Sequence, residues 1–356
     1  MVSLKGKRIL VTGGTGTVGR ELVRYLFSKK PEVVRIYSRD ESKQFELIHE
    51  FGVDRDDVRF LIGDVRDKDR LRRAMEEIDI VFHAAALKHV YSCEYNPFEA
   101  IKTNVFGIQN VIDAAMEENV SKVIFTSSDK AANPSNVMGT TKLLGEKLIT
   151  AANYYKGNRK TVFTSVRFGN VVGSRGSIVP LFLEQIKKGG PVTITHPDMT
   201  RFVMGIDDAV KLIINAADWT RGGEVFVSKM DALRIADLID VMIEDYAPKF
   251  GFEPSKIKVK TIGVKAGEKL YEELMTDEEA TRCLETEDAF ILLPQLKELL
   301  PARTASWMHA GAKPMRQGTA FKSCDAPLMS NEDIRKFLAR TVKPEDEAKT
   351  FNNDED

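Results

Sequence analysis

Short runs of β-branched and other apolar residues alternate with amphipathic segments through the first half of the 356-residue chain. Such runs predict buried strands, and the segments between them have the apolar periodicity of helices. Six strands are expected on this basis: Arg8–Thr12, Val33–Ser38, Val58–Ile62, Ile80–His83, Lys122–Thr126 and Thr161–Val166. The alternation predicts an α/β fold, a doubly wound parallel sheet with helices on both faces.

The expected helices between these strands include Ser42–Phe51, a long one at Pro97–Glu118 and one that opens at Met138. Beyond Gly169 the alternation loosens. The further expected elements are strands at Val192–Thr195 and Glu224–Ser228, an edge strand with one buried face at Lys256–Ile262, and helices at Asp207–Trp219, Ile235–Tyr246 and near Asn331–Leu338. We therefore expect a Rossmann domain at residues 1–168, into which the chain later recrosses. A smaller α/β substrate lobe is expected mainly at 169–340, followed by an acidic, disordered tail at 341–356.

The overall composition is that of an ordinary globular protein. The chain is 43% hydrophobic and 29% charged, and its net charge of -1 gives no support to nucleic-acid binding. Its three cysteines have no metal-ligand or disulfide-framework spacing, which indicates a reducing compartment and no metal. No apolar run is long enough to span a membrane and no signal-peptide pattern precedes the first strand, so a cytoplasmic location is expected.

Three glycines follow the first expected strand: Gly13, Gly16 and Gly19. Glycine adopts positive φ without penalty, and a missing side chain lets the backbone approach a pyrophosphate. The helix that follows would present N–H groups to that anion. In the first turn of a βαβ pattern this spacing predicts a dinucleotide site, although a plain glycine-rich turn is the alternative.

The end of the second strand bears on the choice of dinucleotide. An acidic residue there would bind the ribose 2′-hydroxyl of NAD. The chain has Ser38 and Arg39 instead, with Lys43 one turn later, and both cations could pair with a 2′-phosphate. Asp40 follows directly and Arg39 could be a solvated loop charge, but the pattern favours NADP over NAD.

Ser128, Asp129 and Lys130 place a hydroxyl, a carboxylate and an ammonium on adjacent residues just after the fifth strand. The pair Asn133-Pro134 marks a turn, so the trio lies on a strand-to-helix loop. In an open parallel sheet, ligands bind at the carboxyl ends of the strands. The trio is therefore a candidate for acid–base chemistry, with a solvated loop and a local ion pair as the alternative.

Together these segments resemble the extended short-chain dehydrogenase/reductase superfamily, through TGGTGTVG, GDV at Gly63–Val65, AAA at Ala84–Ala86 and the helix with Met138-x-x-x-Lys142. More closely, the chain is similar to UDP-N-acetylglucosamine 4,6-dehydratases of surface-polysaccharide synthesis. That likeness depends on IYSRDESKQ, AAALKHV, SSDKAANPSNVMGTTK, RFGNVVGSRGSIVP, MTRFVM and GEKLYEEL, which span roughly residues 8 to 340.

The resemblance implies a reaction on a UDP-sugar. The C4 hydroxyl is oxidised to a ketone, the ketone acidifies the C5 proton, water leaves across C5 and C6, and the hydride returns to C6. Lys130 would take the C5 proton, Asp129 would protonate the leaving hydroxyl, and Ser128 would hydrogen-bond the C4 oxygen. The implied NADP contacts are Gly13, Thr15, Gly16, Thr17, Val18, Gly19, Ser38, Arg39, Lys43, Asp64, Val65, Ala84, Ala85, Ala86, Asn104 and Lys142. For Asn104, a helix-surface amide is the alternative.

Met138 stands where most of the superfamily has the tyrosine that removes the hydroxyl proton during oxidation. Methionine cannot take a proton. A branch of the dehydratases resembles this chain in having methionine there. In that branch Asp129 would act as both base and acid, and configuration at C5 tends to be retained.

The resemblance also suggests substrate contacts at Lys88, His89, Asn170, Ser177, Arg201, Lys265 and Glu268. Arg201 suits a diphosphate because its fork matches phosphate oxygens. Lys265 replaces the family's usual arginine and loses that fork. Alternatively, His89 is an ordinary partly buried histidine and Glu268 pairs with Lys269 on a helix face. A homo-oligomer is expected. Two other functions stay open: a UDP-sugar 4- or 5-epimerase, and a non-catalytic NADP-binding regulator.

Overall fold

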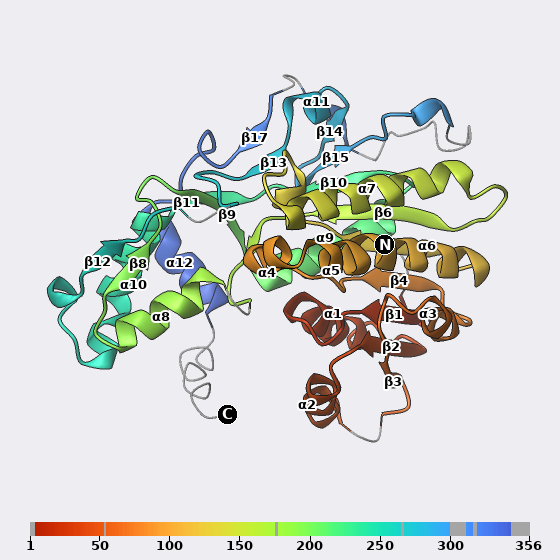
Figure 1. Cartoon of the computed structure of the whole chain (residues 1–356), viewed down its shortest axis with the longest axis horizontal. Coiled ribbons are helices and arrows are strands. Elements are labelled where there is room, and N and C mark those ends of the chain that lie inside the picture. The colour runs from red at the N-terminus through yellow and green to blue at the C-terminus, as the bar shows by residue number, and fades with distance from the viewer. Residues whose placement is uncertain are drawn as a thin grey trace. The chain divides into compact units, whose positions relative to one another are not determined.

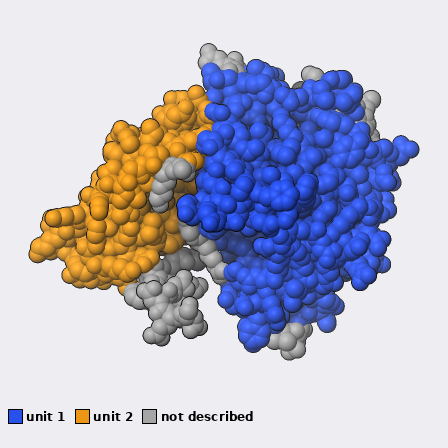
Figure 2. All heavy atoms as spheres, in the orientation of Figure 1, with its two compact units in different colours: residues 1–168, 210–229, 274–320 blue, residues 169–209, 230–273, 321–356 orange. Residues whose placement is uncertain are grey.

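The chain forms two compact units in a computed structural model. The structure describes residues 4–52, 55–174, 177–264, 267–299, 311–315 and 319–342. Unit 1 comprises residues 1–168, 210–229 and 274–320, and unit 2 comprises residues 169–209, 230–273 and 321–356 (Figure 2). The chain therefore passes between the units five times, and neither unit is a continuous stretch of sequence.

A ten-stranded sheet forms the centre of unit 1, in the order β16-β14-β15-β10-β6-β5-β4-β1-β2-β3 (Figure 1). Its strands are β1 (Arg8–Thr12), β2 (Val33–Ser38), β3 (Val58–Ile62), β4 (Ile80–His83), β5 (Lys122–Thr126), β6 (Val162–Arg167), β10 (Val225–Ser228), β14 (Cys283–Glu285), β15 (Ala289–Leu292) and β16 (Lys313–Pro314). All pairs from β3 to β10 are parallel. The six strands predicted in the first half of the chain are confirmed.

Helices cover this sheet. They are α1 (Thr17–Phe27), α2 (Glu41–Phe51), α3 (Lys68–Met75), α4 (Val90–Tyr95), α5 (Pro97–Ile101), α6 (Gly107–Glu117), α7 (Val137–Tyr155) and α11 (Asp277–Ala280). Leu10, Val81 and Val123 of the sheet belong to one apolar core with buried side chains of α3, α6 and α7. Their neighbours Ile9, Val11 and Ile124 are also buried, as expected for strands covered on both faces. The predicted doubly wound fold is therefore observed.

Antiparallel strands extend the sheet at one edge, beyond the prediction. β15 pairs antiparallel with β10, β14 with β15, and β16 with β14. These strands have two to four residues each, too short to produce a periodic signal in the sequence.

The predicted helix Pro97–Glu118 is wrong in one respect. A π-helical turn, Lys102–Phe106, separates α5 from α6. Such single turns insert an extra residue and frequently occur at functional sites. Here the turn buries Asn104, which is only 1% exposed. The helix α3 was not predicted, because only Leu71, Ala74 and Met75 of its eight residues are buried among charged neighbours.

Unit 2 contains a three-stranded sheet, β11-β9-β7, and a parallel pair, β12-β8. Its elements are β7 (Asn170–Val171), α8 (Ile178–Lys187), β8 (Val192–Ile194), β9 (Thr200–Met204), β11 (Asp231–Arg234), α10 (Ile235–Tyr246), β12 (Val259–Thr261), β17 (Phe321–Lys322), α12 (Asn331–Thr341) and the 3-10 turns Pro248–Phe250 and Pro254–Lys256. Apolar side chains of α8, α10 and α12 form its core. Two elements, α9 (Ile206–Trp219) and β13 (Glu273–Met275), include residues of both units.

The edge strand predicted at Lys256–Ile262 is wrong in length and in burial. Only Val259–Thr261 is a strand, and all three of its residues are exposed. The buried residue of this run, Ile257, follows a 3-10 turn and precedes the strand. The helix predicted near Asn331–Leu338 is confirmed as α12 and ends at Thr341. Residues 343–356 of the expected tail lie outside the described part of the chain.

Candidate active site

The ends of four neighbouring strands meet at one edge of the unit 1 sheet. Thr12, the last residue of β1, is in register with Tyr37 of β2 and His83 of β4, and His83 is in register with Phe125 of β5. The segments that follow these strands carry most of the expected cofactor and catalytic residues. Parallel pairing therefore brings together residues from Thr12 to Phe125, which lie 113 positions apart in the sequence.

The glycine loop connects β1 to α1 in a conformation that only glycine fits. Gly13 has φ of 70°, and a Cβ atom there would lie 2.6 Å from the Ala85 backbone nitrogen. A Cβ atom on Gly19 would lie 2.3 Å from the Gly13 carbonyl oxygen. Gly16 is the N-cap of α1 and supplies no side-chain cap to the helix. The first turn of α1, with Thr17 and Val18, thus presents its N-terminus as a site for an anion.

The end of β2 is held to this loop. The Thr15 and Ser38 hydroxyls are 2.7 Å apart, and the Gly13 N–H donates to the Tyr37 carbonyl at 2.8 Å. Arg39 is about half exposed and lies 3.4 Å from an Asp64 carboxylate oxygen. Lys43 pairs with Asp40, which also caps α2. Both expected phosphate-binding cations therefore have acidic partners in this structure.

The residues expected from the ends of β3 and β4 differ in their surroundings. Asp64 accepts hydrogen bonds from Arg66. Burial alone would raise the pKa of Asp64, but these bonds lower it below its usual value. Val65 is a buried member of the core, where it packs against Gly107. Ala84 donates its N–H to Thr12, so Ala84, Ala85 and Ala86 run beside the glycine loop.

Asn104 holds the segment after β4 in place. Its amide oxygen accepts the Leu87 N–H at 2.8 Å, and its amide nitrogen donates to the Leu87 carbonyl and the Thr141 hydroxyl, each at 3.0 Å. The alternative of a helix-surface amide is therefore wrong. Asn104 links the β4 segment to α7, and through them it shapes the site.

The Ser128–Asp129–Lys130 loop is a connected polar group. Asp129 is 1% exposed and begins a 3-10 turn, Asp129–Ala131. Its Oδ1 accepts from the Ser128 hydroxyl at 2.7 Å, from the Lys130 N–H at 2.9 Å and from the Lys130 ammonium at 3.1 Å. The alternative of a solvated loop is wrong for Asp129. A buried carboxylate with a hydroxyl and an ammonium as partners is able to exchange protons with a bound molecule.

Met138 lies at the start of α7 in an apolar cluster. It is 4% exposed and clusters with Cys93 and Ala100, with Leu87 and Val90 packed against them. The next residue, Gly139, passes so close to the loop that a Cβ atom would lie 2.2 Å from the Lys130 carbonyl oxygen. The methionine therefore fills an apolar space beside the polar loop and supplies no proton donor.

Lys142 follows one turn later and is almost fully buried. Its ammonium donates to the Thr126 carbonyl at 2.9 Å and lies 4.8 Å from the centre of the Phe125 ring. Burial lowers the pKa of Lys142 to about 8. Nearby, burial lowers the pKa of His83 to about 3, so this imidazole is neutral; its Nδ1 is 2.7 Å from the Thr12 hydroxyl.

Sequence reasoning missed three charged residues behind this site: Glu146, Arg167 and Glu279. Arg167, the last residue of β6, has no exposed surface and contacts both carboxylates at 2.6–3.0 Å. An arginine that ends an otherwise uncharged strand was the available signal, because arginine is almost never buried unless it is paired.

Four of the expected substrate contacts are described in unit 2. Asn170 donates to the Phe202 carbonyl at 3.1 Å. The Ser177 hydroxyl, at the start of α8, has no hydrogen-bond partner within the described ranges. Arg201 is 8% exposed and donates to the backbone carbonyls of Thr200, Lys269 and Leu270.

These contacts change the expectation for Arg201 and Glu268. The Arg201 guanidinium, expected to bind the diphosphate, donates to the backbone of Lys269 and Leu270, and Glu268 lies 3.7 Å from it. Residues 267–272 are not helical, so the alternative of Glu268 and Lys269 pairing on a helix face is wrong. Lys265 lies outside the described residues. In unit 1, Lys88 and His89 are exposed, and His89 is the N-cap of α4, so the partly buried alternative for His89 is wrong.

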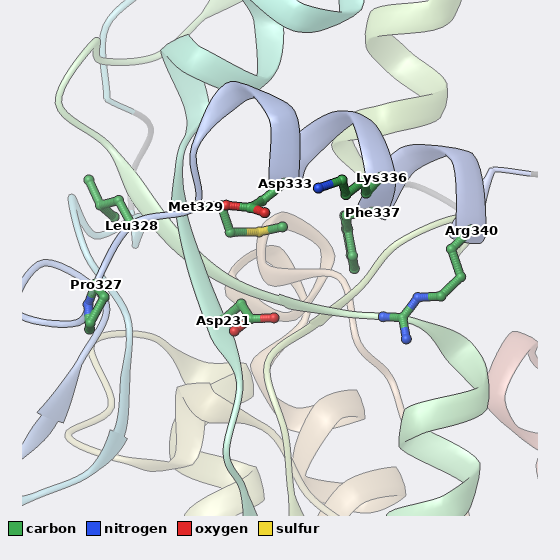
Figure 3. Close-up of a pocket in the computed structure, with 8 residues that line it drawn as sticks. All are labelled: Asp231, Pro327, Leu328, Met329, Asp333, Lys336, Phe337 and Arg340. Carbon is green, nitrogen blue, oxygen red and sulfur yellow. The ribbon is translucent and has the colours of Figure 1, made fainter.

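Unit 2 also has a hollow of about 460 Å³ beside α12 (Figure 3). Four of its lining side chains, Asp333, Lys336, Phe337 and Arg340, extend from α12, and Asp231 comes from β11. None of the lining residues belongs to the expected site. Two of its charged groups are already engaged: Arg340 pairs with Asp208, and Asp333 completes the capping box of α12 with Ser330.

Across the described ranges, no cluster of three or more histidine, cysteine or acidic side chains could hold a metal ion. Nor does any helix in those ranges have the length and apolar character needed to cross a membrane.

A glycine loop at a helix N-terminus and a Ser-Asp-Lys loop at the same sheet edge are features of the extended short-chain dehydrogenase/reductase class. Residues 9–294 match the polysaccharide biosynthesis protein family. The chain belongs to this family.

Three relatives cover almost the whole chain. One, from Methanocaldococcus jannaschii, is named an uncharacterized membrane protein; it is 59% identical over 94% of this chain and 96% of its own length. A Campylobacter jejuni relative is named UDP-N-acetylglucosamine 4,6-dehydratase (inverting). It is 42% identical over 92% of this chain and 95% of its own length. A Rickettsia canadensis relative is named UDP-glucose 4-epimerase. It is 38% identical over 93% of this chain and 95% of its own length.

A crystal structure of Pen from Bacillus thuringiensis is also similar. It is 44% identical, covers 96% of this chain and 100% of that chain, and has a TM-score of 0.88.

Proposed function

We propose that this protein is an NADP-dependent 4,6-dehydratase of UDP-N-acetylglucosamine. The observation that carries the proposal is the buried Asp129 carboxylate, which is bonded to Ser128 and Lys130 at the sheet edge beside the glycine loop. Elimination needs an acid and a base next to each other, and simple epimerisation at C4 does not. The Campylobacter relative supports the substrate and the reaction.

The residues of the glycine loop fit a dinucleotide. Side chains are missing where a pyrophosphate would approach, and the uncapped N-terminus of α1 favours an anion. When bound, the nicotinamide accepts a hydride from C4 and returns it to C6. Arg39 and Lys43 support NADP if they leave Asp64 and Asp40 for a 2′-phosphate. Both cations are partly exposed, so each is able to exchange its carboxylate partner for a phosphate.

The chain's own residues supply the proton transfers. As a carboxylate, Asp129 takes the C4 hydroxyl proton, since Met138 cannot. Lys130 takes the C5 proton in its neutral form, and Asp129 then protonates the departing C6 hydroxyl. Ser128 holds the C4 oxygen. Lys142, cationic and fixed to the Thr126 carbonyl, hydrogen-bonds the nicotinamide ribose.

The proposal includes retention of configuration at C5. Asp129 and Lys130 come from one loop and are in contact, so proton removal and return occur from one side of the sugar. The Campylobacter relative is named inverting, and this is where the proposal departs from it. The proton spectrum of the 4-keto product separates the two C5 configurations.

A UDP-sugar 4-epimerase is the second candidate, and the Rickettsia relative supports it. Incubation with UDP-N-acetylglucosamine separates the candidates by product mass. We expect a product lighter by one water. An isomer of equal mass would indicate an epimerase, and the absence of turnover would indicate a dinucleotide-binding regulator. We expect Lys130→Ala to abolish the lighter product while NADP stays bound, and Lys147→Ala, an exposed lysine of α7, to change neither.

A further inference from the structure

The buried ion group behind the site uses the full donor capacity of one arginine. The Arg167 guanidinium has five N–H donors. Two go to the two oxygens of Glu146, at 3.0 and 2.6 Å, and two go to the two oxygens of Glu279, both at 2.8 Å. The fifth goes to the Leu274 carbonyl at 3.0 Å. Arg167 is therefore held rigidly between α7 and α11.

This triad carries one negative charge that nothing within it balances. One guanidinium faces two carboxylates. Burial alone would raise the pKa of Glu279, but Arg167 lowers it to about 2, so Glu279 is a carboxylate. Burial opposes the charge on Arg167, but the two carboxylates raise its pKa above the usual value. Arg167, Glu146 and Glu279 are 0%, 3% and 7% exposed, so solvent screens this charge poorly.

Lys142 carries a further buried positive charge on the same helix as Glu146. It lies four residues before Glu146 on α7, and residues with this spacing share one face of a helix. Lys142 is 6% exposed, so the two cations and two anions form a buried group with no net charge. Besides Glu146, the titratable groups that affect Lys142 are Cys93 of α4 and His83 of β4. Burial keeps both of these neutral near pH 7.

The same arginine also fixes the catalytic loop. Arg167 ends β6, and the next residue, Phe168, accepts the Asp129 N–H at 3.0 Å. Immobilising the end of β6 therefore immobilises the backbone at Asp129.

We propose that Arg167, Glu146 and Glu279 are positioning residues that keep Lys142 cationic. In this arrangement Glu279 of α11 supplies the excess negative charge. Arg167 binds Glu279 and also Glu146, which lies one turn after Lys142 on α7, and so couples that charge to the Lys142 ammonium. The role in turnover rests on the proposed function; the charge coupling does not.

The test is an NMR titration of the resting enzyme labelled with [6-¹³C]lysine, with Lys142 assigned by the signal missing in Lys142→Arg. In the parent enzyme we expect this signal to titrate near pH 8. Glu279→Gln removes a negative charge that favours the ammonium, so the midpoint should move to lower pH. The shift should be smaller than the roughly one to three units that a directly contacting charge produces.

Glu278→Gln is the matched control, because it neutralises the neighbouring carboxylate of the same helix. Glu278 is 59% exposed and pairs with Arg282 outside the triad. The Lys142 titration midpoint in Glu278→Gln should match that of the parent enzyme. Glu279→Asp moves the carboxylate away from Arg167 by one methylene, so its Lys142 midpoint should lie between those of the parent enzyme and Glu279→Gln. If Glu279→Gln does not fold, Glu279→Asp provides the test. Equal midpoints in the parent enzyme and the folded Glu279 variants would overturn the proposal.

The pH profile of dehydration separates this proposal from the proposed function. If cationic Lys142 is needed, the alkaline limb of kcat/KM should move to lower pH in Glu279→Gln by the shift that NMR measures. A shifted NMR midpoint without any dehydration would refute the dehydratase and leave the charge coupling intact. Dehydration with an unshifted midpoint would refute the coupling alone.

Discussion

At the scale of single residues, the site depends on which groups can carry a proton. Asp129 is buried and bonded, Met138 is buried and inert, and the two lie on segments that Gly139 brings into contact. A tyrosine at position 138 would share the proton transfers with the loop. In the proposed mechanism, methionine leaves these proton transfers to the Asp129 carboxylate.

Asp129→Asn and Met138→Leu separate these roles. The asparagine keeps the shape but cannot take the C4 proton, so no NADPH should form in a single turnover. Leucine has a similar volume, so Met138→Leu should lower the free energy of unfolding by less than about 1.5 kcal/mol and leave NADPH formation near the parent rate. Cofactor reduction in Asp129→Asn at the parent rate, or its loss in Met138→Leu, would contradict this assignment.

Arg39 tests the choice of cofactor. Its Asp64 contact is long, at 3.4 Å, and its side chain is half exposed, so it is free to turn toward a 2′-phosphate. We expect Arg39→Ala to weaken NADP about tenfold or more and NAD little, because hydrogen bonds to charged groups contribute about 1.5–3 kcal/mol. Calorimetry with both dinucleotides measures this. Arg59→Ala, on the adjacent strand, should change neither, and equal losses of NADP and NAD in Arg39→Ala would rule out a phosphate contact.

At the scale of elements, the loop between β1 and α1 passes so close to the segment after β4 that one of its positions has no room for a side chain. Gly13 and Gly6 have nearly the same φ, 70° and 68°, but a Cβ atom would collide with Ala85 at Gly13 and meet nothing within 4 Å at Gly6. The two positions therefore share a backbone penalty and differ only in the collision.

Gly13→Ala and Gly6→Ala use this difference. Both substitutions should cost about 1–2 kcal/mol of stability from the left-handed backbone. Only Gly13→Ala should add a steric cost and lose dinucleotide binding, because the β4 segment must move away. Urea unfolding and calorimetric titration with NADP measure both effects. Equal behaviour of the two variants would show that the Ala85 contact is unimportant.

Among the elements, those with strong periodicity could be predicted and those held by tertiary contacts could not. The strands from β1 to β6 are apolar enough to be found from the sequence alone. The π turn around Asn104 could not be found, because Asn104 bonds to Leu87 and Thr141, which lie 17 and 37 positions away in the sequence. The Ser128–Asp129–Lys130 loop could be singled out because its residues are adjacent in the sequence. The Arg167 triad, which joins positions 146, 167 and 279, could not.

At the scale of the whole molecule, the sheet of unit 1 is completed by strands that come late in the chain. β6 lies between β5 and β10, and the edge of β6 that faces β10 bonds to residues from Gly223 onward. A ribosome makes about 5–20 residues per second, so the roughly 60 residues between these strands take about 3 to 12 s to emerge. During that interval β6 is an uncovered strand edge, able to pair with other nascent chains. Production of the protein should therefore be most sensitive to slow translation or chaperone shortage between Arg167 and Val225.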